Sequence, residues 1–163
     1  MEYFGYLDQL ISDCYAAKRA IPIKELTLHK DNDFNEIKSI KSAIYIIEEI
    51  DGDSQKTFDK FNAFRKQQEE KEDRDKLKCA QPNSPSTILY VGSSSTGLKK
   101  RLEEHTIKCS KKTHALRLNE WFEGNYKIDV KVYDVPRAIL QLIEDNLAHN
   151  LNPAFGKKGS NNK

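Results

Sequence analysis

The sequence has few cysteines and no long apolar run. Its three cysteines, Cys14, Cys79 and Cys109, are odd in number and form no C-x-x-C pair, so we expect no disulfide framework and favour a reducing, cytoplasmic setting. No apolar run approaches the roughly 18 residues that cross a bilayer. The first residues also lack the basic and then apolar regions of a secretory signal. We therefore expect neither a membrane segment nor a disulfide-stapled secreted domain.

The chain is rich in charge of both signs. It has 163 residues, a length that suits one domain, and 32% of them are charged against 37% that are hydrophobic. Its mean hydropathy of −0.75 is low for a globular chain, so we expect part of the length to lie outside the packed core. The 27 basic and 25 acidic residues give a net charge of +2, which argues neither for nor against a nucleic-acid partner.

The charge is unevenly distributed along the chain. Residues 1–86 hold 14 basic and 17 acidic residues, a net −3, whereas residues 87–163 hold 13 basic and 8 acidic residues, a net +5. Within the second half, residues 97–117 carry seven Lys or Arg against two Glu. A basic stretch of this size is typical of contact with a phosphate backbone, although a merely solvated surface has the same composition.

Hydrophobic periodicity predicts the elements of the first half. Apolar residues at helical spacing predict an amphipathic helix over residues 3–20, and residues 21–40 are expected only to connect. The β-branched run at 42–50 predicts a buried strand. Residues 51–86 hold eight basic and eight acidic residues. We interpret them as a charged insertion with a solvated helix in its middle, which offers no net field to a ligand.

The second half alternates between short strands and helices. Strands are predicted at 87–92 and 127–135, and helices at 96–108, 114–122 and 137–151. This order predicts an α/β (α+β) fold in which a small mixed or antiparallel sheet is flanked by helices. We expect one domain over 1–163, with an N-terminal extension at 1–40 and a core at 42–156 that the 51–86 insertion interrupts.

Two of the predicted helices place charged side chains beside their apolar faces. Arg101 and His105 share a stripe with two leucines of their helix, and Glu144 shares the apolar stripe of the last helix. Burial of such groups is costly unless they are paired, hydrogen-bonded or bound to a metal. Tyr45 and Tyr90, in the two most apolar strands, need partners if buried. Either these residues form one polar site, or they are an ion pair at the rim of the core and ordinary core aromatics.

The order of these residues resembles that of the GIY-YIG nuclease family. Ala43-Ile44-Tyr45 resembles the family's first tripeptide and Tyr90-Val91-Gly92 the second, while Arg101 and His105 resemble the Arg and the following His or Tyr of its first helix. Glu144 resembles the metal-binding Glu, and Asn152-Pro153-Ala154-Phe155 resembles the Pro-x-aromatic close. The series as a whole is more specific than any single tripeptide.

The chain departs from the family pattern at three points. Ala43 stands where the first motif has Gly, a change that adds only a methyl group. Tyr45 and Tyr90 are 45 residues apart, far more than in the family's usual short hairpin, and the charged insertion supplies the excess. Gly156 stands where the family often has Asn, so we assign no residue to the supporting role of that Asn.

The resemblance implies hydrolysis of a DNA phosphodiester with one divalent metal, Mg²⁺, or Mn²⁺ as its substitute. Arg101 would stabilise the charge that grows on the phosphate oxygens, and Glu144 would bind the metal, which stabilises the leaving oxygen. Tyr45 is the candidate general base, with Tyr90 and His105 orienting it or sharing the proton. Five lysines would contact the DNA backbone: Lys99, Lys100, Lys108, Lys111 and Lys112.

Three other functions fit parts of the sequence. The segment from Gly92 to Lys99 nearly matches the phosphate-binding loop of an NTPase, but Leu98 occupies the Lys position. A domain of the nuclease fold without activity would bind DNA in a salt-sensitive way and not cleave it. A zinc site built from His105, Cys109 and His114 lacks a fourth ligand at plausible spacing.

Within the nuclease hypothesis, the small size of the chain favours a site-specific restriction endonuclease acting on double-stranded DNA. Homing and excision-repair nucleases usually carry further domains, so a structure-specific repair nuclease is the alternative. Cleavage of both strands needs two active sites and hence a homodimer, for which residues 1–40 or 51–86 are candidate contacts.

Overall fold

The structure is a computed structural model that describes residues 3–107 and 110–157. In chain order its elements are α1 (Gly5–Arg19), β1 (Lys24–His29), the 3-10 turn η1 (Asn35–Ile37), β2 (Ala43–Ile50), α2 (Ser54–Glu69), β3 (Ile88–Ser94), α3 (Leu98–Thr106), α4 (Leu118–Trp121), β4 (Asn125–Val132) and α5 (Arg137–Leu151). Within the described residues, four strands form one antiparallel sheet flanked by helices, which confirms the predicted fold class.

The strands of the sheet lie in the order β1-β4-β2-β3. β2 reads AIYIIEEI and its first five residues are all buried, as expected for a central strand covered on both faces. β3 forms one edge of the sheet, and its pairing with β2 places Tyr45 opposite Gly92. The two tyrosine motifs are therefore neighbours in space in spite of the long segment that separates them in the sequence.

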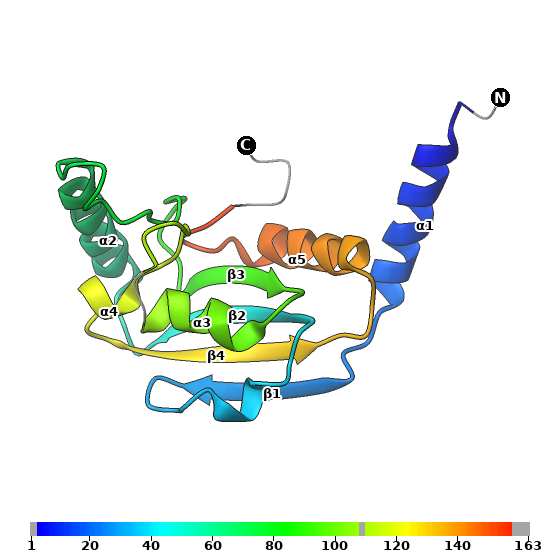
Figure 1. The fold of residues 1–163 in the computed structure, drawn as a ribbon, viewed down its shortest axis with the longest axis horizontal. Coiled ribbons are helices and arrows are strands. Elements are labelled where there is room, and N and C mark those ends of the chain that lie inside the picture. The colour runs from blue at the N-terminus through cyan, green and yellow to red at the C-terminus, as the bar shows by residue number, and fades with distance from the viewer. Residues whose placement is uncertain (1–2, 108–109, 158–163) are drawn as a thin grey trace.

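Helices cover both faces of the sheet. Successive residues of a strand point to opposite faces, and Tyr45 packs in one core cluster with Leu98 of α3. Its neighbour Ile44 packs in a second cluster with Leu140 and Ile143 of α5. Figure 1 shows α3 in front of the strands and α5 running along β3. Side chains from α3 and α5 can consequently meet only around the β3 edge.

Residues 21–40 do more than connect, because they contain the edge strand β1. This strand pairs with β4 over its whole length. Only Leu26 and Leu28 of its six residues pack against the core. Two inward apolar residues give an alternation too short to distinguish a strand from a loop, so the sequence prediction was wrong here.

The charged segment 51–86 contains a helix, as predicted, but this helix lies at Ser54–Glu69 rather than over the charged run 66–78, and it is not purely solvated. Phe61 and Phe64 of α2 are buried. The Phe61 ring lies 4.2 Å from that of Phe155 and 5.2 Å from that of Trp121, centroid to centroid. Burying one such side chain contributes about 1.5–3 kcal/mol, so two phenylalanines dock an otherwise polar helix on the domain.

Candidate active site

Tyr45, Tyr90 and His105 form one aromatic cluster. Tyr45 and Tyr90 come from the paired strands β2 and β3, and His105 comes from α3 above them. The two tyrosine rings are nearly parallel, with centroids 6.1 Å apart, and the His105 ring lies 4.4 Å from that of Tyr90. The Tyr45 hydroxyl and His105 Nε2 are 3.1 Å apart. The structure therefore brings together three residues that the sequence singled out separately.

Two glycines allow this cluster to form. A Cβ at Gly92 would lie 2.5 Å from the hydroxyl oxygen of Tyr45 and 2.8 Å from the Tyr90 ring. A Cβ at Gly156 would lie 2.6 Å from the Tyr90 ring, and Gly156 also has a φ of +101°, a conformation that favours glycine. Gly156, which departs from the family pattern, is thus required by the close approach of Tyr90.

His105 is held as a neutral imidazole with a defined tautomer. It is fully buried, and burial together with the nearby charges of Arg101 and Arg117 holds its pKa well below the usual 6.5. The backbone N–H of Leu116 donates to Nδ1 over 3.2 Å, so Nδ1 carries the lone pair. Nε2 therefore carries the proton, and the Nε2–H group donates a hydrogen bond to the Tyr45 hydroxyl.

Arg117 supports this arrangement from within the protein. Its side chain is fully buried, and it donates hydrogen bonds to the backbone carbonyls of Lys78, Ser110 and Thr113. Arg117 itself has a left-handed backbone conformation, with φ of +59°. Because it follows Leu116 directly, it fixes the chain whose N–H sets the tautomer of His105.

Arg101 is held from three directions. Its guanidinium donates to Glu104 over 3.0 Å, to the hydroxyl of Tyr90 over 3.3 Å and to the carbonyl of His114 over 3.2 Å. Its side chain keeps 23% of its surface exposed, so the charge is oriented and still reachable. Burial raises the pKa of Tyr90, and the Arg101 charge opposes that rise.

Glu144 reaches the same region from the opposite face of the sheet. It lies on α5, and the hydroxyl of Ser93 at the end of β3 donates a hydrogen bond to its carboxylate. Burial raises the pKa of Glu144, while the Ser93 hydrogen bond and the charge of Arg101 lower it. The carboxylate is therefore partly desolvated, and it interacts electrostatically with the positive charge of Arg101.

A pocket of about 560 Å³ opens at the β3 edge between these elements. Tyr90, Arg101 and Glu144 all line it. Tyr45 and His105 do not: they are 1% and 0% exposed and lie behind Tyr90. The phenol that faces the pocket is that of Tyr90, whereas the sequence had favoured Tyr45 as the reactive one.

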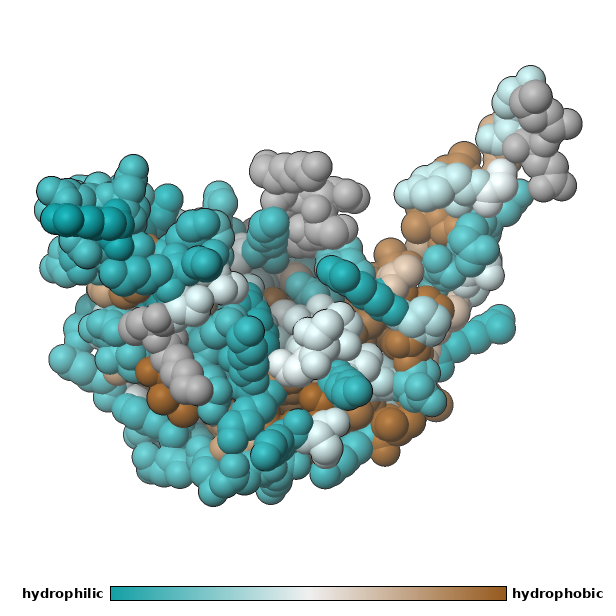
Figure 2. Space-filling view, in the orientation of Figure 1, coloured by the Kyte–Doolittle hydropathy of each residue, from teal (hydrophilic) through white to brown (hydrophobic). Residues whose placement is uncertain are grey.

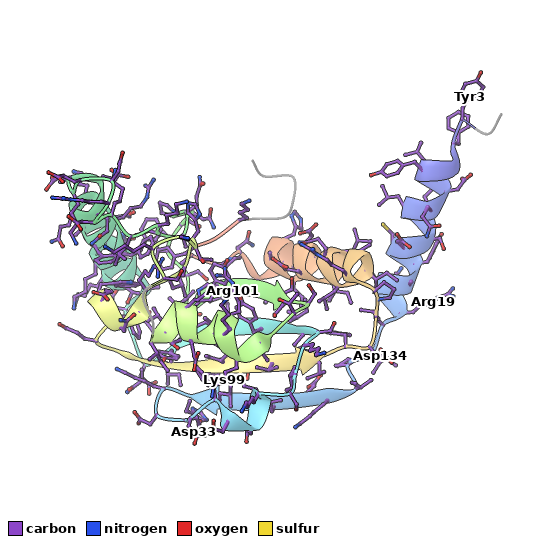
Figure 3. All side chains as sticks on the ribbon, viewed as in Figure 1. Tyr3, Arg19, Asp33, Lys99, Arg101 and Asp134 are labelled. Carbon is purple, nitrogen blue, oxygen red and sulfur yellow. The ribbon has the colours of Figure 1, made fainter. Side chains whose placement is uncertain are left out.

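Of the five lysines predicted to contact DNA, the four that the structure describes do not form one surface. Lys112 lines the pocket, and Lys100 lines a neighbouring depression that Arg101 shares. Lys99 bonds to Asn35, and Lys111 bonds to the carbonyl of Arg74. Figure 3 shows Lys99 and Arg101 on opposite sides of α3. Lys108 lies outside the described residues.

Other basic residues line the pocket without having been predicted. Arg65 comes from α2 and Lys157 from the segment after α5. Nothing in the sequence singled out Arg65, because the charges of residues 51–86 sum to zero. A net charge of zero carries no information about the direction of one side chain. Lys157 was noted only as part of a basic tail. Ser93, adjacent to the Tyr90-Val91-Gly92 motif, was also missed as a partner of Glu144.

The structure argues against two of the alternative functions, the NTPase phosphate-binding loop and the zinc site. The Gly92–Lys99 segment continues β3 as far as Ser94, and the N–H of Leu98 donates to the carbonyl of Ile40, so this segment is not an open phosphate-binding loop. Both ring nitrogens of His105 have partners, which leaves none for zinc. Cys109, the proposed second ligand, lies outside the described residues.

No family model, curated protein or solved structure matches the chain. The likeness to the GIY-YIG family therefore rests on the sequence motifs named above. In the described part of the chain, no helix combines the length and apolar character that crossing a bilayer requires.

Proposed function

We propose that the protein is a divalent-metal-dependent DNA endonuclease of the GIY-YIG type, which hydrolyses phosphodiester bonds. The observation that carries the proposal is the convergence of Tyr90, Arg101 and Glu144, from β3, α3 and α5, on one open pocket. Tyr45 and His105 stand directly behind them in one hydrogen-bonded cluster. A polar cluster of this kind at the edge of a sheet is costly to build, which supports a function beyond stability.

The charge of the pocket suits a phosphodiester. Arg101 presents a guanidinium whose fork matches two phosphate oxygens, and it is already oriented by Tyr90 and Glu104. Arg65, Lys112 and Lys157 line the same pocket. Their charges would hold the backbone of double-stranded DNA on both sides of the scissile phosphate.

The donor set around Glu144 fits Mg²⁺ or Mn²⁺. One carboxylate completed by water and substrate oxygens is an ordinary arrangement for these hard cations. The described residues hold no group of three or more His, Cys, Asp or Glu that would form a protein cage for a metal. When bound, the metal supplies positive charge to the leaving oxygen.

The chain's own residues divide the remaining work. Arg101 would stabilise the negative charge that grows on the phosphate. Tyr90, whose hydroxyl accepts from Arg101 and whose ring lines the pocket, is placed to hold the attacking water. As a phenolate, the form that the Arg101 charge favours, it would take the proton of that water. His105 already donates to Tyr45 and cannot accept the proton of that hydroxyl in this tautomer. Tyr45 and His105 therefore act as positioning residues for Tyr90.

A second candidate, a non-catalytic DNA-binding domain of the same fold, has one observation in its favour. Tyr45, which the family resemblance casts as the general base, is buried and does not reach the pocket. A protein of this kind would bind DNA through Arg65, Lys112 and Lys157 without cleaving it. The two proposals differ in a single measurable property, the dependence of strand scission on Mg²⁺.

Incubation of plasmid and branched DNA with Mg²⁺ tests the proposal. The wild type should cleave, Glu144→Ala and Arg101→Ala should lose at least about a hundredfold in rate, and Lys99→Ala, a change on the opposite side of α3, should not. Discrete plasmid fragments would support a restriction role in the cytoplasm, and cutting only of branched DNA a repair role. Binding without scission would select the non-catalytic domain. Cleavage by Glu144→Ala at the wild-type rate would overturn the metal assignment.

A further inference from the structure

Residues 3–15, which include the first eleven residues of α1, carry most of the exposed large hydrophobic side chains among the described residues. Among the described residues ten large hydrophobic side chains are exposed, and seven of them lie in residues 3–15. They are Tyr3, Phe4, Tyr6, Leu7, Leu10, Ile11 and Tyr15. Figure 2 shows the resulting apolar surface along this helix. An exposed apolar patch this concentrated marks an interaction site in a folded protein.

Only the C-terminal end of α1 is attached to the domain. Ala17 and Ala20 pack against the cluster that contains Leu140 and Ile143 of α5, and α1 has no buried residue among its fifteen. In Figures 1 and 3 the helix extends away from the sheet, with Arg19 next to the domain and Tyr3 at the far end. A helix this short is marginal in water by itself, so a partner that covers its apolar side would stabilise it.

The apolar residues of α1 follow a coiled-coil spacing. Leu7, Leu10, Cys14 and Ala17 succeed one another at steps of three, four and three residues, which makes Leu7 and Cys14 a positions and Leu10 and Ala17 d positions. Ile11 lies at an e position beside this seam. The seam covers four positions over residues 7–17, and the last of them, Ala17, contacts the cluster that contains Leu140 and Ile143 of α5, which leaves Leu7, Leu10 and Cys14 open to a partner.

The charges that flank the seam complement a second copy of the same helix. Asp13 falls at a g position and Lys18 at the following e position. In a parallel pair, a g residue faces the e residue five positions later on the partner helix, so Asp13 of each copy would face Lys18 of the other. In an antiparallel pair, g faces g and e faces e, which leaves Asp13 without a basic partner.

The same charges argue against a membrane surface. Helices that lie on membranes carry Lys and Arg along their polar face. In α1, Asp8 and Asp13 balance Lys18 and Arg19, and both cations sit at the end attached to the domain. The free end would therefore gain no attraction from anionic lipid.

We propose that two copies of the chain associate through α1 as a parallel helix pair, with Leu7, Leu10 and Cys14 of each copy facing their counterparts. Tyr6 and Ile11, exposed at the g and e positions beside this seam, would be covered in the same interface. The proposal does not depend on nuclease activity. If that activity exists, the pair would hold two active sites in one particle.

Sedimentation equilibrium of the full chain measures the association directly. At about 100 µM protein we expect twice the monomer mass of 18.8 kDa, and the monomer mass for the double variant Leu7→Asp/Leu10→Asp. Both leucines are exposed, so circular dichroism should show the same thermal unfolding of the domain. Ser12→Asp is the matched control, because it adds a charge to the far face of the same helix and should leave the dimer intact.

Oxidation by diamide tests the parallel register. Diamide joins two thiols as a disulfide and is itself reduced to the hydrazine. A variant with Cys14 as its only cysteine should form a covalent dimer, because a faces a in a parallel pair, and Leu7→Asp/Leu10→Asp in that background should not.

Three results would overturn the proposal. A dimer that never cross-links through Cys14 excludes the parallel register. A dimer that survives Leu7→Asp/Leu10→Asp places the interface elsewhere on the chain. A monomeric wild type that floats with phosphatidylcholine–phosphatidylserine vesicles identifies the stripe as a membrane-binding surface.

Discussion

Tyr45 and Gly92 lie directly opposite each other on the paired strands β2 and β3, and the Tyr45 hydroxyl fills the space that a Cβ at Gly92 would occupy. The glycine of the second tripeptide thus leaves the space that the tyrosine of the first tripeptide occupies. This explains physically why the two motifs must occur together although 45 residues separate the two tyrosines. Because the Tyr45 hydroxyl is hydrogen-bonded to His105, the pairing of β2 with β3 also helps to position the His105 ring.

Gly92→Ala should therefore disturb the cluster as a whole. The added methyl group would lie 2.5 Å from the Tyr45 hydroxyl, and overpacking of this kind costs about 1–3 kcal/mol in the free energy of unfolding. Urea unfolding measures the loss. The matched variant is Gly97→Ala, where the backbone is extended and nothing lies within 4 Å of the new Cβ. Equal stability of the two variants would contradict the packing argument.

The burial of His105 predicts how stability changes with pH. The folded protein holds the pKa of His105 well below its usual 6.5, so below pH 6.5 the unfolded chain binds this proton and the folded chain does not. The stabilisation is complete above pH 6.5 and is lost as the pH falls, by about 1.4 kcal/mol per pH unit. In His105→Gln the free energy of unfolding should be lower but should depend less on pH between 6.5 and 5.

His114 provides the control for this measurement. Its pKa is also lowered, by burial and by nearby cations, but its side chain is exposed, so solvent screens these interactions. His114→Gln should therefore keep most of the pH dependence of the wild type. If His114→Gln and not His105→Gln flattens the curve, the neutral His105 is wrongly assigned.

The carboxylate of Glu144 predicts how metal binding depends on pH. Burial raises its pKa above the usual 4.5, and a protonated carboxyl does not bind metal. Mn²⁺ affinity, measured by calorimetry, should thus fall with decreasing pH at a midpoint above 4.5. Ser93→Ala removes a donor that lowers this pKa, so the midpoint should move further up. Ser95→Ala is the control and should leave it unchanged.

The sequence predicted which polar side chains gather near the β3 edge better than it predicted the structure around them. Arg101, His105 and Glu144 could be found because each is a charged or polar residue in an apolar stripe, a local conflict that periodicity exposes. Their convergence with Tyr45 and Tyr90 followed from the family resemblance. Which phenol faces the pocket did not follow from it, because this depends on the strand order of the sheet, in which β3 with Tyr90 lies at the edge and β2 with Tyr45 lies inside.

The misses have a common physical origin. β1 is stabilised by pairing with β4 rather than by its own hydrophobic pattern. Arg65 reaches the pocket because Phe61 and Phe64 dock α2 on the core. Both features depend on contacts between segments that are distant in the sequence. Such contacts cannot be deduced from the net charge of a segment or from hydrophobic periodicity, which is a local pattern.

The placement of the lysines and of Arg65 predicts which residues meet the DNA backbone. Each phosphate contact that is lost should reduce the slope of log affinity against log salt concentration by about 0.9. Lys112→Ala and Arg65→Ala should each do so, because both residues line the pocket with Arg101. Lys99→Ala removes the same charge from the opposite side of α3, where Lys99 bonds to Asn35, and should leave the slope unchanged. Fluorescence anisotropy with a labelled duplex at several salt concentrations gives all three slopes. If only Lys99→Ala reduced the slope, the DNA would have to bind on the side of the molecule that carries η1. Any cleavage site would then also lie on that side.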